Sequence, residues 1–248
     1  QDGCTLFNFS ASHDGIGLRP VEGLLPEDEI AKMIDTIMGF GGRVTMRSYE
    51  GREVPYEMNT TLFSALKGTI HGEDYFHDAR FIASQTIMMS LEGIPAFYIQ
   101  SLLASENDEA RAAHAGHNRA LNRTQWSSED IDAAMSDENS PLFQIFYELK
   151  NRLEIRKKQK AFHPDATQFT LHLKPGMFGF WRQSLDRKQS LFVVTNITHE
   201  EKLLSLRDMN LYQQAQWKDL LSNTIVDPSD EVLTLSPYQS IWITNVSG

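Results

Sequence analysis

The sequence predicts an α/β part followed by a small all-β part, with domains expected at residues 1–162 and 163–248. Two observations lead to this prediction. Apolar residues recur at helical spacing between short β-prone segments in the first part, whereas after Pro164 apolar and polar residues alternate between turn residues. A chain of 248 residues is also long enough to bury a sizeable core.

The first part opens with a β-prone segment at residues 5–11, which predicts a buried strand that ends in the polar loop 12–17. A helix over residues 25–38 follows, because proline and acidic residues stand at its start and Gly39 at its end. The charged residues 43–59 have no clear periodicity, so they predict a long surface loop.

Further along, apolar spacing predicts a helix over residues 74–90, followed by a tight turn and a second buried strand over residues 94–99. Ser127 begins a sequence typical of a helix cap. Ser140, followed by proline, predicts the start of a last helix that runs to about Lys160. Two parallel strands alone cannot make a stable α/β sheet, so this part is expected to need further strands.

The tail predicts a small antiparallel β-sandwich of about six strands. Glycine, proline, asparagine and aspartate stand between the alternating segments, as they do in turns. The predicted strands cover residues 167–173, 179–182, 191–197, 202–206, 232–235 and 240–244.

Composition limits the classes of partner. The 23 basic and 33 acidic residues give a formal charge of −10, which disfavours nonspecific binding to nucleic acid or to an anionic membrane surface. No apolar run reaches the length of a membrane span, and the single Cys4 cannot form an internal disulfide, so a cytoplasmic location is expected. The chain has neither a signal peptide nor an initiator methionine, which suggests a part of a longer protein.

A series of short motifs carries a resemblance to a known family. Residues 11–17, Ala-Ser-His-Asp-Gly-Ile-Gly, resemble the fourth conserved region of the α-amylase superfamily, glycoside hydrolase family 13, and the Gly-Ile-Gly ending resembles its sucrose phosphorylase subfamily. The sequence at residues 10–13 and 19–23 resembles that of the glucosylglycerate phosphorylases of this subfamily. Further matches follow in order at residues 56–60, 93–98, 106–108, 118–123, 193–196, 217–221 and 235–240.

The resemblance implies that the chain is the C-terminal portion of a (β/α)8 TIM barrel, with strands seven and eight and their helices, followed by a C-terminal β domain. Active-site residues then fall at the C-terminal ends of strands. No segment resembles the motifs of the family's nucleophilic aspartate and acid/base glutamate. The chain is therefore expected to be a partial enzyme, completed by an N-terminal half that is missing or on another chain.

By resemblance, Asp14 is the transition-state stabiliser, a third carboxylate that binds the ring hydroxyls of the glucosyl unit. His13 is expected to donate a hydrogen bond to the sugar. Taken alone, each residue has a simpler explanation. Asp14 would satisfy backbone donors in a strand-end turn, and His13 would pack against a neighbouring loop. The ordered set of motifs favours the catalytic interpretation.

Three further residues are expected to bind substrate. Arg119 matches a family arginine that bonds glucose, with a surface ion pair to Glu106, Asp108 or Glu109 as the alternative. Tyr56 matches a loop tyrosine that contacts phosphate or the acceptor. The third residue expected to bind substrate is Glu57, which replaces a glutamine of sucrose phosphorylases. Val54 likewise replaces an aspartate, and both changes weaken a sucrose assignment.

The expected function is that of a glycoside phosphorylase, a hexosyltransferase. It would transfer a glucosyl unit from glucosylglycerate, or from a sucrose-like α-glucoside, to phosphate. The product would be α-glucose 1-phosphate. An α-glucosidase or transglucosylase of the same superfamily, or a non-catalytic carbohydrate-binding fragment, remains open. Arg43, Arg47 and Arg52 are candidates to clamp a glycerate carboxylate, although ordinary solvation is expected for any single one. No nucleic acid or membrane partner is expected, and a homodimer is a candidate assembly.

No metal and no cofactor other than inorganic phosphate as co-substrate are expected. His114 and His117 have a spacing that metal ligands can have, but no third ligand follows at a suitable distance. We therefore expect both histidines to face solvent.

Overall fold

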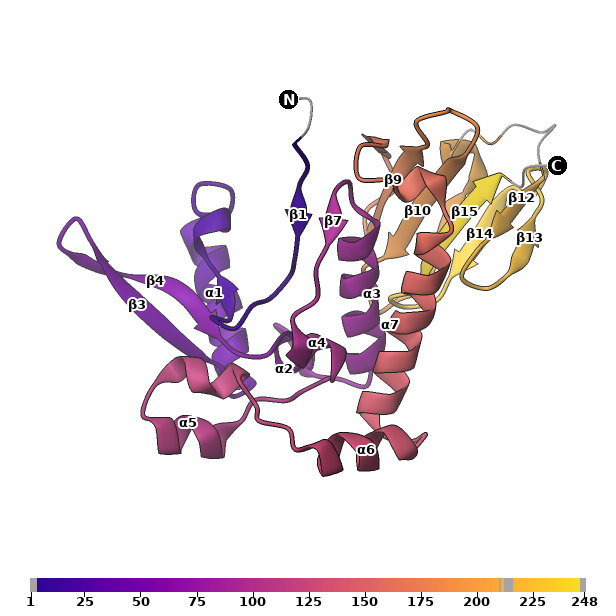
Figure 1. Cartoon of the computed structure of the whole chain (residues 1–248). Coiled ribbons are helices and arrows are strands. Elements are labelled where there is room, and N and C mark those ends of the chain that lie inside the picture. The colour runs from indigo at the N-terminus through magenta and orange to yellow at the C-terminus, as the bar shows by residue number, and fades with distance from the viewer. Residues whose placement is uncertain (1–3, 210, 212–215, 246–248) are drawn as a thin grey trace. The chain divides into compact units, whose positions relative to one another are not determined.

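The computed structural model describes residues 4–209, 211 and 216–245 (Figure 1). The chain forms two compact units that are discontinuous in sequence. Of the described residues, one unit contains those up to Asn8, Ile82–Ala96 and those from Glu148 onwards; the other contains Phe9–Phe81 and Phe97–Tyr147. The predicted domain limits at residues 162 and 163 stay a prediction. No helix in the described ranges is both long and apolar enough to cross a membrane.

In the second unit, a helix and a three-stranded sheet form around a small apolar core. The helix α1, Glu27–Gly39, confirms the predicted helix and has Glu27, Asp28 and Glu29 in its first turn, where the helix dipole favours negative charge. Its residues Ile30, Met33, Ile34 and Ile37 belong to the same apolar cluster as Leu18 and Met58. The sheet has the order β2-β4-β3.

The surface loop predicted for residues 43–59 is wrong. This segment is a hairpin of β3, Arg43–Tyr49, and β4, Arg52–Asn59 (Figure 1). Its turn has positive φ at both Glu50 and Gly51, the conformation that matches the twist of the two strands. Glutamate is not a residue that usually signals such a turn, and the charged strand ends obscured the alternation. The strand β2, Ile16–Gly17, pairs with the other end of β4.

Short helices complete this unit, and their caps match the sequence. Ser127 accepts a hydrogen bond from the backbone N–H of Asp130, which confirms the predicted cap of α6. Asp108 caps α5 in the same way through Arg111. The bounds are α2, Leu62–Ala65; α4, Ile99–Leu102; α5, Glu109–Ala115; the 3-10 helix η2, Asn118–Asn122; and α6, Ser128–Ser136.

In the first unit, β1, Phe7–Asn8, pairs in parallel with β7, Ile94–Pro95. Both strands are shorter than predicted, and α4 already begins at Ile99. The predicted burial of the first strand is also wrong, because the Phe7 residue is 65% exposed. A parallel strand becomes buried only when strands flank it and helices cover it, and in the described chain β1 has β7 as its ladder partner.

Two long helices connect the two units in sequence. The helix α3, His77–Ser90, corresponds to the predicted helix over residues 74–90. The helix α7, Pro141–Lys157, begins as predicted, because the hydroxyl oxygen of Ser140 accepts a hydrogen bond from the backbone N–H of Phe143.

The tail contains a six-stranded sheet of order β13-β12-β15-β10-β9-β8 and a two-stranded sheet of β11 and β14. The strands β12 and β13 were not predicted, because each has only three residues. Apolar side chains of both sheets, among them Phe192, Leu204 and Trp217, form one buried cluster. The bounds are β8, Thr167–Thr170; β9, Met177–Gln183; β10, Ser190–Asn196; β11, Lys202–Ser205; β12, Trp217–Asp219; β13, Thr224–Val226; β14, Val232–Leu235; and β15, Ser240–Asn245.

A fully buried arginine ties the sheet to α3. The guanidinium of Arg182 donates to the carbonyl oxygens of Ser90, His163 and Ala166 at 2.9–3.1 Å. Burial lowers the pKa of Arg182 to about 10. The charge lies at the C-terminal end of α3, where the helix dipole is negative. This side chain therefore satisfies the buried carbonyl oxygens of Ser90 and Ala166, whereas that of His163 also accepts from the backbone N–H of Ala166 at 2.9 Å.

Replacing this side chain should destabilise the fold strongly. In Arg182→Leu, the buried carbonyls of Ser90 and Ala166 lose the guanidinium donor, and we expect the free energy of unfolding to fall by about 2–4 kcal/mol in urea titrations. Arg207→Leu is the matched control, because its exposed side chain makes a 3.5 Å pair with Glu231, worth about 0.5 kcal/mol or less. Equal losses in the two variants would contradict the bridging role of Arg182.

Candidate active site

The candidate site is built on the tight turn Ser12–Gly15. The backbone N–H groups and carbonyl oxygens of Ser12 and Gly15 bond each other at 3.0–3.1 Å, and the hydroxyl of Ser12 accepts from the N–H of Asp14. Gly15 has φ of +112°, and a Cβ added there would lie 2.3 Å from the carbonyl oxygen of Met58. Only glycine fits this position, so the turn presents His13 and Asp14 at its tip.

The strand β4 provides the residues that face this turn. Asn59 is fully buried, and its side-chain amide donates to the backbone carbonyl of Asp14 at 3.0 Å and to Oε1 of Glu57 at 2.9 Å. Glu57 and Asn59 are two residues apart, so they lie on the same face of the strand. The amide of Asn59 therefore links the turn to the carboxylate of Glu57.

Arg119, on η2, connects two carboxylates. Its Nε and Nη2 donate to the two oxygens of Glu57 at 2.8 and 3.0 Å, and its Nη1 lies 2.9 Å from Oδ1 of Asp14. The Glu57 contact is bidentate, the geometry that gives a guanidinium its strongest and most directional pairs. The side chain of Glu57 is only 5% exposed, whereas those of Asp14 and Arg119 are 38% and 41% exposed. Asp14 and Arg119 are thus partly exposed to solvent, whereas Glu57, which binds Arg119, is buried.

The electrostatics of Glu57 follow from these contacts. Burial raises the pKa of Glu57, but hydrogen bonds from Arg119 and Asn59 and the positive charges of Arg119 and Arg123 outweigh burial and hold that pKa below its ordinary value. The same hydrogen bond raises the pKa of Arg119. Glu57 is therefore a carboxylate at neutral pH despite its burial.

Two residues of this site were not singled out from the sequence. The buried amide of Asn122 donates to the carbonyl oxygens of Ser12 and His13 at 3.2 and 3.0 Å. Arg123 donates from Nε to the carbonyl oxygen of His13 at 2.7 Å, and its Nη2 lies 3.4 Å from Oδ1 of Asp14. Both belong to the motif at residues 118–123, which was the available signal. They hold the backbone of the turn and add a second cation beside Asp14.

The structure brings the five predicted site residues together. Nε2 of His13 lies 3.3 Å from Asp14, and its side chain is largely exposed. Asp14, Tyr56 and Glu57 line a cavity of about 390 Å³. The ion-pair partners of Arg119 are Glu57 and Asp14. These replace the surface pairs considered for it, namely Glu106, Asp108 and Glu109. The catalytic and binding roles of the five stay predictions.

Two of the three arginines considered as carboxylate clamps, Arg43 and Arg47, already have acidic partners. Nη2 of Arg43 lies 2.7 Å from Glu109, and Nη2 of Arg47 lies 3.0 Å from Glu22. The guanidinium of Arg47 also lies 5.0 Å from the ring centre of Tyr49 and 5.8 Å from that of Tyr56. A carboxylate ligand would have to compete with these contacts.

The histidines and the other potential metal ligands form no metal site in the described ranges. His114 and His117 are both exposed, as expected. Among residues 4–209, 211 and 216–245, no group of three histidine, cysteine, aspartate or glutamate side chains could hold a metal ion.

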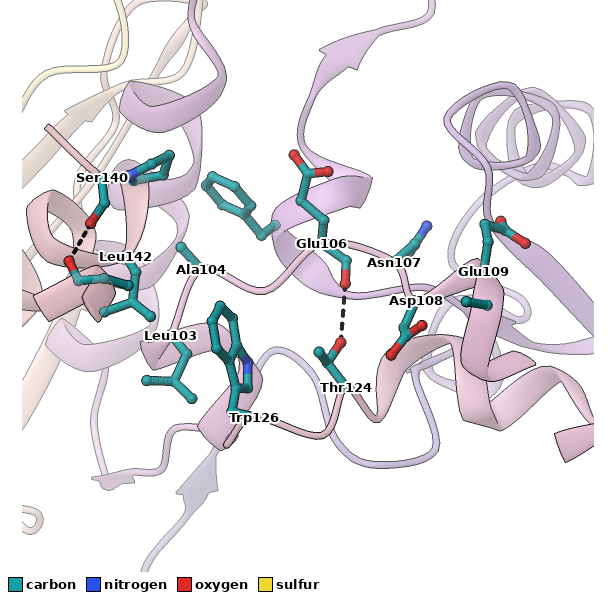
Figure 2. A pocket seen from close by; sticks show the side chains of 14 residues that line it. Leu103, Ala104, Glu106, Asn107, Asp108, Glu109, Thr124, Trp126, Ser140 and Leu142 are labelled. Carbon is teal, nitrogen blue, oxygen red and sulfur yellow. Dashed lines mark hydrogen bonds between the residues drawn. The ribbon is translucent and has the colours of Figure 1, made fainter. Parts of the chain in front are cut away.

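A larger cavity of about 560 Å³ lies elsewhere in the same unit (Figure 2). Trp126, Leu103 and Leu142 line it together with Glu106 and Asp108. Two of its polar groups stabilise the local fold: the indole N–H of Trp126 donates to the hydroxyl of Ser105, and the side chain of Asp108 caps α5. We therefore place the candidate site at the Asp14 cavity, where exposed charged groups converge.

Solved structures identify the class of fold. Sucrose 6F-phosphate phosphorylase from Thermoanaerobacter thermosaccharolyticum has a TM-score of 0.62 at 19% identity, over 77% of this chain and 35% of that chain. The α-amylase from Geobacillus thermoleovorans has a TM-score of 0.51 at 17% identity, over 68% and 34%. The chain therefore has a fold of the α-amylase type, mixed α/β with a sheet-rich part.

Curated relatives identify the group within this class. The chain is 35% identical over 243 residues to glucosylglycerate phosphorylase of Escherichia coli, covering 96% of this chain and 41% of that protein. The Spirochaeta thermophila enzyme of the same name is 32% identical over 96% and 42%. Sucrose phosphorylase of Streptococcus mutans is 30% identical over 50% and 25%. The chain matches no protein-family model.

These relatives are glycoside phosphorylases, and the chain is homologous to them over nearly all of its length. The chain spans about two fifths of the length of the glucosylglycerate phosphorylases that it matches. This confirms the resemblance to the sucrose phosphorylase subfamily inferred from the motifs.

The glycine of the turn offers a direct stability test. Gly15→Ala would place a Cβ 2.3 Å from a backbone oxygen, so we expect the free energy of unfolding to fall by about 2 kcal/mol or more. Gly23→Ala is the control, because Gly23 also has positive φ but no atom within 4 Å of the added Cβ; its cost should be about 1 kcal/mol. Urea titrations measure both. Similar losses would show that contact with β4 does not constrain the turn.

The lowered pKa of Glu57 predicts a pH dependence with a definite sign. Because the folded chain binds this proton less tightly than the unfolded chain, its contribution to stability is present above the ordinary value of 4.5 and is lost as pH falls through the lower folded value. The difference in unfolding free energy between the wild-type chain and Glu57→Gln should therefore shrink as the pH falls from 4.5 towards the lower folded value. A difference that stays constant from pH 7 to pH 3 in urea titrations would contradict this.

Proposed function

We propose that this chain supplies the glucose-binding side of a retaining glycoside phosphorylase that transfers a glucosyl unit from an α-glucoside to phosphate and forms α-glucose 1-phosphate. The observation that carries the proposal is the half-exposed carboxylate of Asp14 at the tip of a turn, 2.9 Å from Arg119. An oriented carboxylate and a guanidinium beside one cavity suit a sugar, whose hydroxyls both donate and accept hydrogen bonds.

In retaining transfer, a nucleophilic carboxylate attacks the anomeric carbon while a carboxylic acid protonates the leaving oxygen, and the resulting glucosyl ester is then attacked by the acceptor. In this proposal a phosphate oxygen is that acceptor, and its proton passes to the acid/base residue. Asp14 performs neither step. It binds the ring hydroxyls, and these contacts strengthen as positive charge develops at the anomeric centre, which lowers the barrier.

The nucleophile and the acid/base residue come from polypeptide beyond this chain, so the isolated chain should have no turnover. We assign β1 and β7 to strands seven and eight of a (β/α)8 barrel, residues 1–162 to the barrel part and residues 163–248 to a β-sandwich. The exposed side chains of Phe7 and Ile94 support this, because a parallel pair with apolar residues exposed suits further strands and helices that cover it. Cytoplasmic location and a homodimer stay predictions.

Glucosylglycerate is the proposed donor. The three relatives that match 96% of this chain are all glucosylglycerate phosphorylases, whereas the sucrose phosphorylase of Streptococcus mutans matches half of it. A glycerate carboxylate would pair with a guanidinium, and Arg47 beside Tyr56 is the candidate if it exchanges its contact with Glu22.

A chimera tests the proposal. This chain replaces the matching segment of the Escherichia coli glucosylglycerate phosphorylase, and release of glucose 1-phosphate from glucosylglycerate and phosphate is measured. We expect activity in the chimera and none in the isolated chain. Asp14→Asn should lower kcat by roughly a hundredfold or more with a much smaller change in KM, because the carboxylate acts mainly in the transition state.

Asp165→Asn is the matched control, because this exposed aspartate is remote from the candidate site in sequence and should leave kcat unchanged. Release of free glucose at a rate independent of phosphate would instead support an α-glucosidase or transglucosylase. Sugar binding without turnover in a folded chimera would support a non-catalytic carbohydrate-binding chain.

A further inference from the structure

We infer that Glu57 is a positioning residue that holds Arg119 and cancels its charge, instead of contacting substrate as the motif comparison predicts. The assignment of its effect to a sugar site rests on the function proposed above. The geometry on which it depends does not, because every contact lies within the described chain.

Three donors of the described chain occupy most of the carboxylate of Glu57. Oε1 accepts from Nε of Arg119 at 2.8 Å and from the amide of Asn59 at 2.9 Å, and Oε2 accepts from Nη2 of Arg119 at 3.0 Å. The side chain is 5% exposed. Glu57 lines the Asp14 cavity, but Oε1 already accepts two hydrogen bonds, so a sugar hydroxyl could bond only at Oε2, beside the contact with Arg119.

The same pair fixes where the guanidinium points. With Nε and Nη2 held by Glu57, the plane of the guanidinium is set, and the remaining Nη1 is directed to Asp14 at 2.9 Å. Half-exposed arginine side chains otherwise populate many rotamers. Glu57 therefore determines the position of the group that orients Asp14.

Glu57 also sets the charge of the cluster. The carboxylates of Asp14 and Glu57 balance the guanidiniums of Arg119 and Arg123, so the cluster has no net charge while His13 is neutral. Neutralising Glu57 would leave one positive charge beside an open cavity. Such a charge attracts anions, whereas a glucosyl unit carries none. We therefore assign to Glu57 a specificity role: it keeps phosphate and carboxylates away from Arg119.

The first measurement is the exchange of the Arg119 Hε proton in the ¹⁵N-labelled chain, with its resonance assigned by its loss in Arg119→Lys. The bidentate pair should protect this proton, and Glu57→Gln should speed its exchange with water by about tenfold or more. Asp14→Asn is the matched control, because Asp14 contacts Nη1 and should leave the Hε protection intact. Unchanged protection in Glu57→Gln would overturn the positioning role.

The second measurement titrates inorganic phosphate against the Arg119 Hε resonance. Glu57→Gln should bind phosphate at this arginine about fivefold more tightly than wild type, because one carboxylate charge is removed. Glu57→Asp keeps the charge, so its phosphate affinity should stay close to wild type even where the shorter side chain loses the bidentate geometry. Equal phosphate affinity in wild type and Glu57→Gln would overturn the charge role.

Glu22→Gln is the control for a general loss of surface charge. It removes the partner of Arg47 by the same substitution and should leave phosphate binding at Arg119 unchanged. If Glu57→Gln does not fold, Glu57→Asp still tests positioning through Hε exchange. These measurements need no turnover, so an inactive chimera would defeat the proposed function alone, and an active chimera with unchanged Hε exchange would defeat this inference alone.

Discussion

The pairing of Arg119 with two carboxylates is the interaction on which the candidate site depends. Asp14 and Glu57 both lie within hydrogen-bonding distance of one guanidinium, and without a cation two such close carboxylates would repel each other and favour protonation of one of them. The bidentate contact with the buried Glu57 holds this guanidinium in a fixed position. The exposed carboxylate of Asp14 then has a defined position without being buried itself.

Three segments far apart in sequence meet at this cation, and each contributes a different constraint. The turn requires a glycine at position 15, because β4 passes too close for any side chain. The strand β4 places Glu57 and Asn59 on one face, and η2 returns to the turn with Asn122 and Arg119. A short helix and a short turn have little stability alone, so their mutual hydrogen bonds make the site and the local fold one structure.

The sequence was sufficient where local rules dominate, and it failed where long-range contacts decide. The cap at Ser127 and the helix α1 depend on neighbouring residues and were predicted correctly. The hairpin of residues 43–59 was missed because Glu50 at positive φ is an uncommon turn residue. Asp14 and Arg119 were found through motifs, whereas Asn122 acts on backbone carbonyls more than a hundred positions away, which no local pattern encodes.

The charge balance of the site bears on how a phosphorylase would handle two kinds of ligand. A neutral sugar gains from oriented donors and acceptors, whereas phosphate needs excess positive charge. The guanidiniums of Arg119 and Arg123 are offset by the carboxylates of Asp14 and Glu57, and on the hairpin Arg47 is offset by Glu22. Only Nη2 of Arg47 bonds the half-exposed Glu22, so an anionic ligand can replace this pair more readily than the bidentate pair between Arg119 and the buried Glu57. The two guanidiniums thus differ in how firmly a carboxylate holds them, because Arg119 bonds Glu57 through two nitrogen atoms and Arg47 bonds Glu22 through one.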